Sequence, residues 1–278
     1  MRYKSTMRVC LIFGLCVALT ACGASQAPRP APAAVTEPTA HHDVVDYVAG
    51  DTKLEGYLAY PDGPATKRAA VVVFHDWMGL GPNTKMRADM LAKLGYVTLA
   101  GDLYGKGVRP ANAAEAGKLA GQYKADRATL RGRARAALDV LVATGKVDPA
   151  KVAAIGYCFG GTAALELARS GAPLAGTVSF HGGLSTPSPD DAKNIKGRVL
   201  VLHGADDPFV KPEEVAGFET EMRAAKVDWT FVAYGGAVHA FTVEAAGNDP
   251  SKGAAYDAKA DRRSWEAMRG FFGEIFAP

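Results

Sequence analysis

The feature that most constrains the fold of this 278-residue chain is a series of short apolar segments separated by helical ones. The apolar segments do not alternate with polar residues, which is typical of strands buried on both faces. The predicted strands are 69–74, 96–100, 152–157, 174–180, 199–203 and 229–234, and the predicted helices are 83–93, 113–123, 127–143, 161–169, 212–225 and 256–272. Strands that alternate with helices imply right-handed crossovers, so we predict an α/β domain with a doubly wound, mostly parallel sheet.

A second strand pattern precedes these segments. Residues 44–48 and 54–60 alternate apolar and polar side chains around a turn at 49–51, which predicts an antiparallel hairpin at the sheet edge. A hydrophobic content of 48% is typical of a soluble globular protein, and we expect one domain over residues 43–278. The formal net charge of +3 is partly carried by the N-terminal segment, and no basic run indicates nucleic-acid binding.

The first 42 residues have the pattern of an export and anchoring segment. Basic residues, a short apolar core and the sequence Leu-Thr-Ala-Cys ending at Cys22 predict a lipoprotein signal peptide over 1–21, with Cys22 lipidated. Residues 22–42 are rich in Pro and Ala and predict an extended tether. We therefore expect an exported, lipid-anchored protein of the cell envelope, on the periplasmic side of the outer membrane if the host is Gram-negative. His41 and His42, at the end of this tether, do not by themselves indicate a metal site.

Cys158 lies in the sequence Gly156-Tyr157-Cys158-Phe159-Gly160-Gly161, between an apolar strand and a helix-forming segment. This strand, turn and helix pattern is typical of a nucleophile elbow, in which glycines allow a strained turn to present the central side chain. The helix N-terminus favours a thiolate, and the Phe159 amide can donate to an oxyanion. Cys10, Cys16 and Cys22 belong to the N-terminal segment, so Cys158 is the single cysteine of the domain.

An acid and a histidine follow the elbow in the chain order expected for such a fold. Asp206 and Asp207 come directly after the strand 199–203, and His239 follows the strand 229–234. His239 is the predicted general base, and either aspartate could orient it. The other histidines that end strands, namely His75, His181 and His203, are interpreted as structural residues that could border the substrate.

The loop after the first central strand should supply the second oxyanion donor, and the Trp77 amide is the candidate. Asp76 would lie close to the thiol. Its alternative role as a helix cap is disfavoured because Asn83 and Thr84 are better placed for it.

The chain resembles the dienelactone hydrolase family in five blocks that occur in that family's order: 74–80 (FHDWMGL), 102–107 (DLYGKG), 156–161 (GYCFGG), 207–210 (DPFV) and 238–241 (VHAF). The resemblance spans roughly residues 43–276. It implies an α/β-hydrolase fold and a triad of Cys158, Asp207 and His239. It also implies that Asp76 stands where the family usually has a glutamate that holds the resting thiol.

Val243 departs from the family, because enzymes that cleave dienelactone resemble one another in an arginine four residues after the histidine. We therefore expect neutral esters to be turned over at least as well as a carboxylate-bearing dienelactone, unless Arg87, Arg109 or another cation reaches the pocket.

The sequence thus predicts a monomeric hydrolase that cleaves a small ester or lactone through a thioester, with no metal or organic cofactor. There are two alternatives. A glutamine amidotransferase-like fold also has a cysteine elbow, but it resembles a Cys, His, Glu order with glutamate two residues after the histidine, where this chain has Phe241. A non-catalytic envelope binding protein that retains the hydrolase fold is favoured only by Asp76 and Val243.

Overall fold

The computed structural model describes residues 39–63 and 67–277. The predicted signal peptide, Cys22 and most of the predicted tether lie outside the described residues. The strands are β1 (Ala40–Ala49), β2 (Thr52–Pro61), β3 (Arg68–Phe74), β4 (Val97–Gly101), β5 (Val147–Tyr157), β6 (Gly176–Phe180), β7 (Arg198–Gly204) and β8 (Trp229–Tyr234). The α-helices are α1 (Pro82–Lys93), α2 (Ala113–Ala125), α3 (Arg127–Ala143), α4 (Phe159–Arg169), α5 (Pro212–Ala225) and α6 (Ala258–Ile275), with short 3₁₀ helices at Pro189–Asn194, Glu244–Ala246 and Pro250–Lys252.

One eight-stranded sheet of order β1-β2-β4-β3-β5-β6-β7-β8 organises the domain. The strands from β4 across to β8 are parallel, and β1 and β2 form an antiparallel hairpin that joins the sheet through β2 and β4. The predicted doubly wound sheet with its N-terminal hairpin is therefore confirmed. Parallel strands end at the same edge, so the loops after β3, β5, β7 and β8 gather on one side of the sheet.

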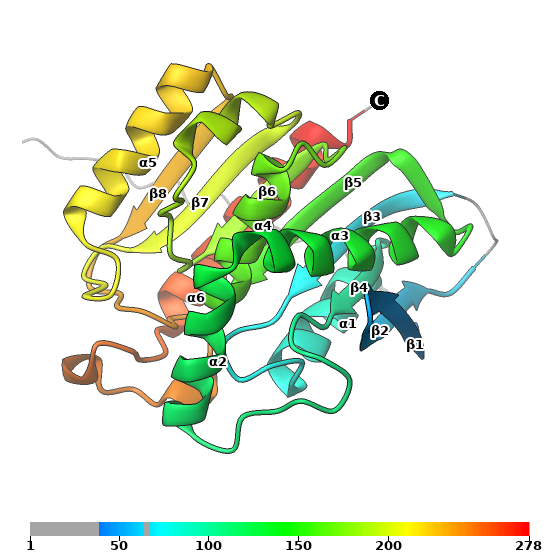
Figure 1. The fold of residues 1–278 in the computed structure, drawn as a ribbon, viewed down its shortest axis with the longest axis horizontal. Helices are drawn as coiled ribbons and strands as arrows, with labels where there is room; N and C mark the ends of the chain where they lie inside the picture. Colours follow the sequence, from blue (N-terminus) through cyan, green and yellow to red (C-terminus); the bar gives the residue numbers. More distant parts are fainter. Residues whose placement is uncertain (1–38, 64–66, 278) are drawn as a thin grey trace, which may run out of the picture. The chain divides into compact units, whose positions relative to one another are not determined.

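Helices cover both faces of the sheet (Figure 1). On β3, Ala70 and Val72 pack in the cluster that contains residues of α3 and α4, whereas Val71 and Val73 pack in the cluster that contains residues of α6. Successive side chains of a strand point to opposite faces. When helices cover both faces, the odd-numbered and the even-numbered side chains of the strand must therefore both be apolar. This explains why the central strands lack alternation in the sequence.

The sequence of helix α3 predicts an apolar stripe that faces the core and an opposite face on which the arginines are solvated. The stripe is buried, with Leu130, Ala134, Ala137, Leu138 and Leu141 facing the core. The solvated arginine face is wrong, because Arg133 is only 9% exposed and Arg131 pairs with Glu166 and Asp191. A guanidinium can be buried when carbonyl and carboxylate oxygens satisfy its donors, which a helical periodicity does not reveal.

Several boundaries also differ from those predicted. β1 begins at Ala40, so His41 and His42 lie in this strand. α1 begins at Pro82 with Gly81 as its N-cap, so neither Asn83 nor Thr84 caps it. Among the described residues, no helix has both the length and the apolar character needed to cross a membrane.

Candidate active site

Cys158 occupies the turn between β5 and α4, with φ +54° and ψ −114°. Two glycines make this turn possible. A Cβ at Gly156 would lie 2.0 Å from the Gly160 carbonyl oxygen, and a Cβ at Gly160 would lie 2.2 Å from the Phe74 carbonyl oxygen. Any side chain at either position would collide with backbone, so the close approach of strand and helix requires glycine. The turn leaves Cys158 partly exposed at the edge where the strands end.

A row of hydrogen bonds joins Cys158, His239 and Asp207. The Nε2 atom of His239 lies 3.1 Å from the Cys158 sulfur, and its Nδ1 atom lies 2.7 Å from Oδ2 of Asp207. Asp207 is buried and also accepts a bond of 2.8 Å from the Phe209 amide, whereas Asp206 is exposed. The structure thus brings together the predicted residues and selects Asp207 as the partner of His239.

The electrostatics of this row favour a thiolate and an imidazolium. Burial by itself would raise the pKa of the Cys158 thiol, but the charge and hydrogen bond of His239 lower that pKa below its usual value, with a smaller contribution from Lys124. Burial by itself would lower the pKa of His239, but the charge of Cys158 and the hydrogen bond to Asp207 raise it to about 10. The N-terminus of α4, which begins directly after Cys158, also favours the anion.

The two predicted oxyanion donors lie on neighbouring elements. Trp77 follows β3 and Phe159 opens α4, and β3 and β5 are adjacent strands whose ends pair Phe74 with Gly156. Within residues 39–63 and 67–277, neither the Trp77 amide nor the Phe159 amide has a hydrogen-bond acceptor. Two unpaired amides at this edge can receive an oxygen that develops negative charge.

Asp76 lies in the same loop, but its carboxylate does not bond to the thiol. Its Oδ1 atom accepts a hydrogen bond of 2.8 Å from the Met78 amide, while the Cys158 sulfur bonds to His239. Burial raises the pKa of Asp76, and its negative charge opposes formation of the thiolate. A role of Asp76 in holding the resting thiol stays a prediction.

The model of the dienelactone hydrolase family matches residues 54–276. The chain belongs to the dienelactone hydrolase family. It is 45% identical to m3DLH, with a TM-score of 0.82 over 85% of this chain and 99% of that one. It is also 45% identical to a dienelactone hydrolase-like promiscuous phosphotriesterase from metagenomic libraries, with a TM-score of 0.80 and the same coverage.

Among curated relatives, an Aquifex aeolicus protein assigned as a carboxymethylenebutenolidase is 30% identical over 82% of this chain and 96% of its own length. The family and these relatives identify the chain as a hydrolase of the α/β-hydrolase fold that acts on esters or lactones.

Hydrogen bonds to which the sequence analysis assigned no role hold the loops of this family member in place. Tyr104 donates a hydrogen bond of 3.1 Å to the Trp77 carbonyl oxygen. The buried Arg133 donates bonds of 2.7 Å to the carbonyl oxygens of Leu103 and Tyr104. These contacts join residues about 30 positions apart, so no local pattern in the sequence could indicate them.

His75 fastens the Asp76 peptide to the loop after β4. Its Nε2 accepts a bond of 3.0 Å from the Leu103 amide, so Nδ1 carries the proton and donates to the Asp76 carbonyl oxygen at 2.6 Å. Its buried ring therefore has the structural role that the sequence predicts.

The cations near the site are distributed differently from those of the family pattern. Val243 is half-buried and uncharged. Arg87 bonds to Thr242 and Asp261, and Arg109 bonds to the carbonyl oxygens of Leu80 and Val108. Lys124 is the cation whose charge acts on Cys158, and its Nζ lies 3.7 Å from the position that a Cβ would take at Gly183. It is exposed, and it makes no ion pair with the part of the chain that the structure describes.

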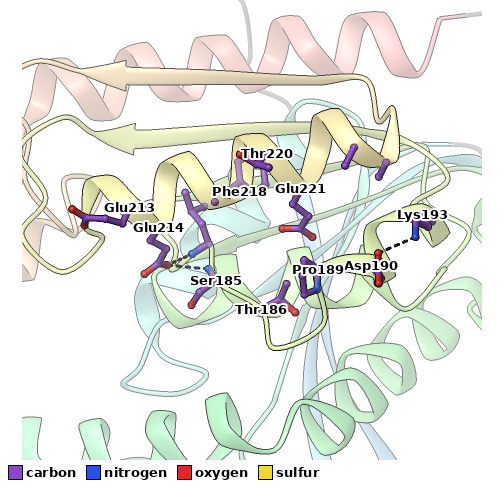
Figure 2. A pocket seen from close by; sticks show the side chains of 14 residues that line it. Ser185, Thr186, Pro189, Asp190, Lys193, Glu213, Glu214, Phe218, Thr220 and Glu221 are labelled. Atoms are coloured by element: carbon purple, nitrogen blue, oxygen red, sulfur yellow. Dashed lines mark hydrogen bonds and ion pairs between the residues drawn. The ribbon is translucent and has the colours of Figure 1, made fainter.

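Two of the cavities that the described residues form lie along α5, away from the sulfur. One, of about 700 Å³, lies between α5 and the segment 184–193, and Figure 2 shows Phe218 and Glu221 facing Ser185, Thr186 and Pro189 across it. The other, of about 470 Å³, is lined by Asp207 and His203. Neither is lined by Cys158 or His239.

Among residues 39–63 and 67–277, no group of three or more His, Cys, Asp or Glu is placed to hold a metal ion.

Proposed function

We propose that this dienelactone hydrolase family member cleaves a small ester or lactone through a thioester on Cys158. The observation that carries the proposal is the hydrogen-bonded row of Cys158, His239 and Asp207 at the edge where the parallel strands end. A nucleophile, a base and an acid that orients the base are the three components that acyl transfer requires.

The mechanism begins with the thiolate of Cys158. Its sulfur attacks the ester carbonyl carbon, and the amides of Trp77 and Phe159 stabilise the oxyanion that forms. The tetrahedral intermediate collapses, the C–O bond breaks, and the His239 imidazolium gives its proton to the leaving alkoxide. His239 then takes a proton from water, the hydroxide attacks the thioester, and the carboxylic acid leaves as the sulfur recovers its negative charge.

Exposed apolar side chains near the triad indicate what the substrate carries. Trp77 and Met78 are 38% and 37% exposed beside the proposed oxyanion site, and Phe209 is 60% exposed with its ring edge-on to that of His239 at 5.5 Å. Together with the uncharged Val243, these side chains favour a neutral ester with an aromatic or alkyl substituent.

Phosphotriesters are a second candidate substrate class, favoured by the 45% identical relative named as a promiscuous phosphotriesterase. The same thiolate would attack phosphorus, the P–O bond to the leaving aryloxide would break as the P–S bond forms, and water would then have to cleave the P–S bond for turnover. An assay of a p-nitrophenyl phosphotriester beside p-nitrophenyl acetate separates the two classes, because both release the same chromophore.

The proposed nucleophile is tested by p-nitrophenyl acetate hydrolysis in Cys158→Ala and His239→Ala. We expect each variant to lose activity by about 1,000-fold or more, and the double variant to lose little beyond either single one, because members of such a row act as a unit. Asp207→Asn should also lose activity, whereas Asp206→Asn is the matched control and should not. Circular dichroism checks that each variant is folded.

Retention of most activity in Cys158→Ala would place the nucleophile elsewhere. A wild type that is folded but neither turns over esters nor reacts with iodoacetamide at Cys158 faster than a free thiol would favour the non-catalytic binding protein.

We also propose that the mature chain is anchored by lipid on Cys22 and, in a Gram-negative host, faces the periplasm. The support is the order of basic residues, apolar core and Leu-Thr-Ala-Cys in the sequence. Acyl chains on one cysteine would supply the two signals that stable anchoring needs.

A further inference from the structure

His181 is a buried histidine that the proposed mechanism does not use. It follows β6 directly, is 0% exposed, and has a φ of +39°. The left-handed region is unfavourable for a residue with a side chain, and such conformations persist where the surrounding structure holds them in place. The contacts that hold His181 in this conformation therefore indicate the role of its side chain.

The ring of His181 stands edge-on to the ring of His239. The two centroids are 5.3 Å apart with an interplanar angle of 66°, and Phe241 lies against His181 at 5.1 Å and 79°. On its other side, His239 contacts the edge-on ring of Phe209. The imidazole of His239 is therefore held between two rings, one buried and one exposed, which restricts its rotation about the Cβ–Cγ bond.

A chain of hydrogen bonds fixes His181 to the segment that carries His239. The Nε2 atom of His181 lies 2.8 Å from the hydroxyl oxygen of Thr242, three residues after His239. The carbonyl oxygen of Thr242 accepts a bond of 2.8 Å from Arg87, which pairs with Asp261 at 2.7 Å. Elements α1, α6 and the end of β6 thus all hold Thr242 in one position.

The His181 ring is neutral, so it can lie beside His239 when His239 carries a positive charge. Burial, with the positive charges of His239, Arg87 and His203, holds the pKa of His181 well below its usual value. The ring is therefore neutral at physiological pH, and it contacts the imidazolium of His239 without repelling it. Its Nδ1 atom has no hydrogen-bond partner among the described residues.

We propose that His181 is a positioning residue, which through its bond to Thr242 and its ring contact holds His239 in the plane where it bonds to Asp207 and Cys158 together. This inference rests on the proposed function, because it concerns how the Cys158–His239 ion pair is kept populated. Loosening the segment 239–242 should allow His239 orientations that lack the sulfur contact. The thiol of Cys158 would then lose the cation that stabilises its anion.

The test uses Thr242→Val, which removes the hydroxyl and keeps the side-chain shape, and His181→Phe, which keeps a ring but removes the bond. We expect kcat for p-nitrophenyl acetate to fall about tenfold in each with KM within about twofold of the wild type. The pH at which alkylation of Cys158 by iodoacetamide is half-maximal should rise by about one unit. Thr242→Ser retains the hydroxyl, so its kcat and its pH of half-maximal alkylation should equal those of the wild type.

Thr98→Val is the matched control, because Thr98 is a fully buried threonine on β4 whose hydroxyl, unlike that of Thr242, has no partner among the described residues. It should leave kcat and the alkylation profile unchanged. Thermal unfolding of every variant separates positioning from loss of folded protein. If alkylation in Thr242→Val and His181→Phe follows the wild-type pH profile, the positioning role is wrong even when stability falls. If the wild type itself shows no activity that depends on Cys158, the proposed function fails instead.

Discussion

Cys158 and His239 form a pair in which the sulfur gives up its proton more readily than an ordinary thiol and the ring holds its proton more strongly. The lowered pKa of Cys158 and the pKa of about 10 of His239 arise mainly from each other's charge, against the effect of burial. A buried thiol without the imidazolium would instead have a raised pKa, because burial disfavours the anion. The pair is therefore reactive only while both members are present.

The pH dependence of Cys158 alkylation by iodoacetamide should report the lowered pKa of the thiol directly. Because the folded thiol has a lowered pKa, we expect Cys158 to react at neutral pH much faster than free cysteine, and the rate to fall only as acid protonates the thiolate. In His239→Ala the cation is lost and burial remains, so the profile should move to higher pH, past that of free cysteine. A wild-type profile that coincides with the profile of free cysteine would contradict the ion pair.

The response of the enzyme to substrate charge should depend on the uncharged Val243, and Lys124 is the cation whose charge acts on Cys158. We expect the wild type to hydrolyse p-nitrophenyl acetate with a kcat/KM at least as high as that for dienelactone. A charge-assisted contact contributes about 1.5–3 kcal/mol, so Val243→Arg should shift the preference toward the carboxylate by about tenfold to a hundredfold.

A wild type that prefers dienelactone by orders of magnitude would show that another cation serves the carboxylate. Lys124→Gln would then test whether that cation is Lys124, with Lys118→Gln, on the same helix, as the control.

At the scale of elements, the close contact of β3, β5 and α4 decides whether the elbow can form. Gly160 lies where a Cβ would be 2.2 Å from the Phe74 carbonyl oxygen and 2.6 Å from that of His75. These are backbone atoms of the strand and of the loop that carries Asp76, so they cannot yield as a flexible side chain would. Helix and strand would have to separate.

We therefore expect Gly160→Ala to lower the free energy of unfolding by about 3 kcal/mol or more and to reduce esterase activity strongly. Gly121→Ala is the matched control, because a Cβ at this exposed helical position meets nothing within 4 Å. It should stabilise the protein by about 0.5–1 kcal/mol, the difference in helix propensity. Urea unfolding monitored by circular dichroism gives both values, and equal effects of the two substitutions would contradict the packing argument.

At the scale of the whole molecule, the attachment predicted for Cys22 is tested in the native host by fractionation. Cys22→Ser should leave the membrane fraction or be misprocessed, because lipid cannot be added to serine, while its esterase activity per folded molecule should equal that of the wild type. A wild-type protein that is entirely soluble with an unmodified N-terminus would remove the anchoring proposal and leave the catalytic one intact. Size-exclusion chromatography of the soluble variant would also test the predicted monomer.

The sequence by itself determined the class of fold and the residues that could form the site. Apolar strands without alternation predict a covered parallel sheet, and the Gly-rich turn at Cys158, the aspartates after β7 and His239 after β8 each follow a strand end. These signals are local, since they depend on periodicity and turn chemistry over a few residues. The predicted signal peptide and the predicted Pro-rich tether also rest on local patterns, and apart from residues 39–42 they lie outside the described residues.

Tertiary structure decided which of these residues meet. Asp207 rather than Asp206 bonds to His239 because the turn after β7 buries one carboxylate and exposes the other. The burial of Arg133 and the Thr242–His181 bond depend on elements that the sheet order brings together. Contacts such as Cys158–His239, across 81 residues, follow from strand order and register. A local pattern does not encode them, because the burial and hydrogen bonding that select them exist only once the sheet has formed.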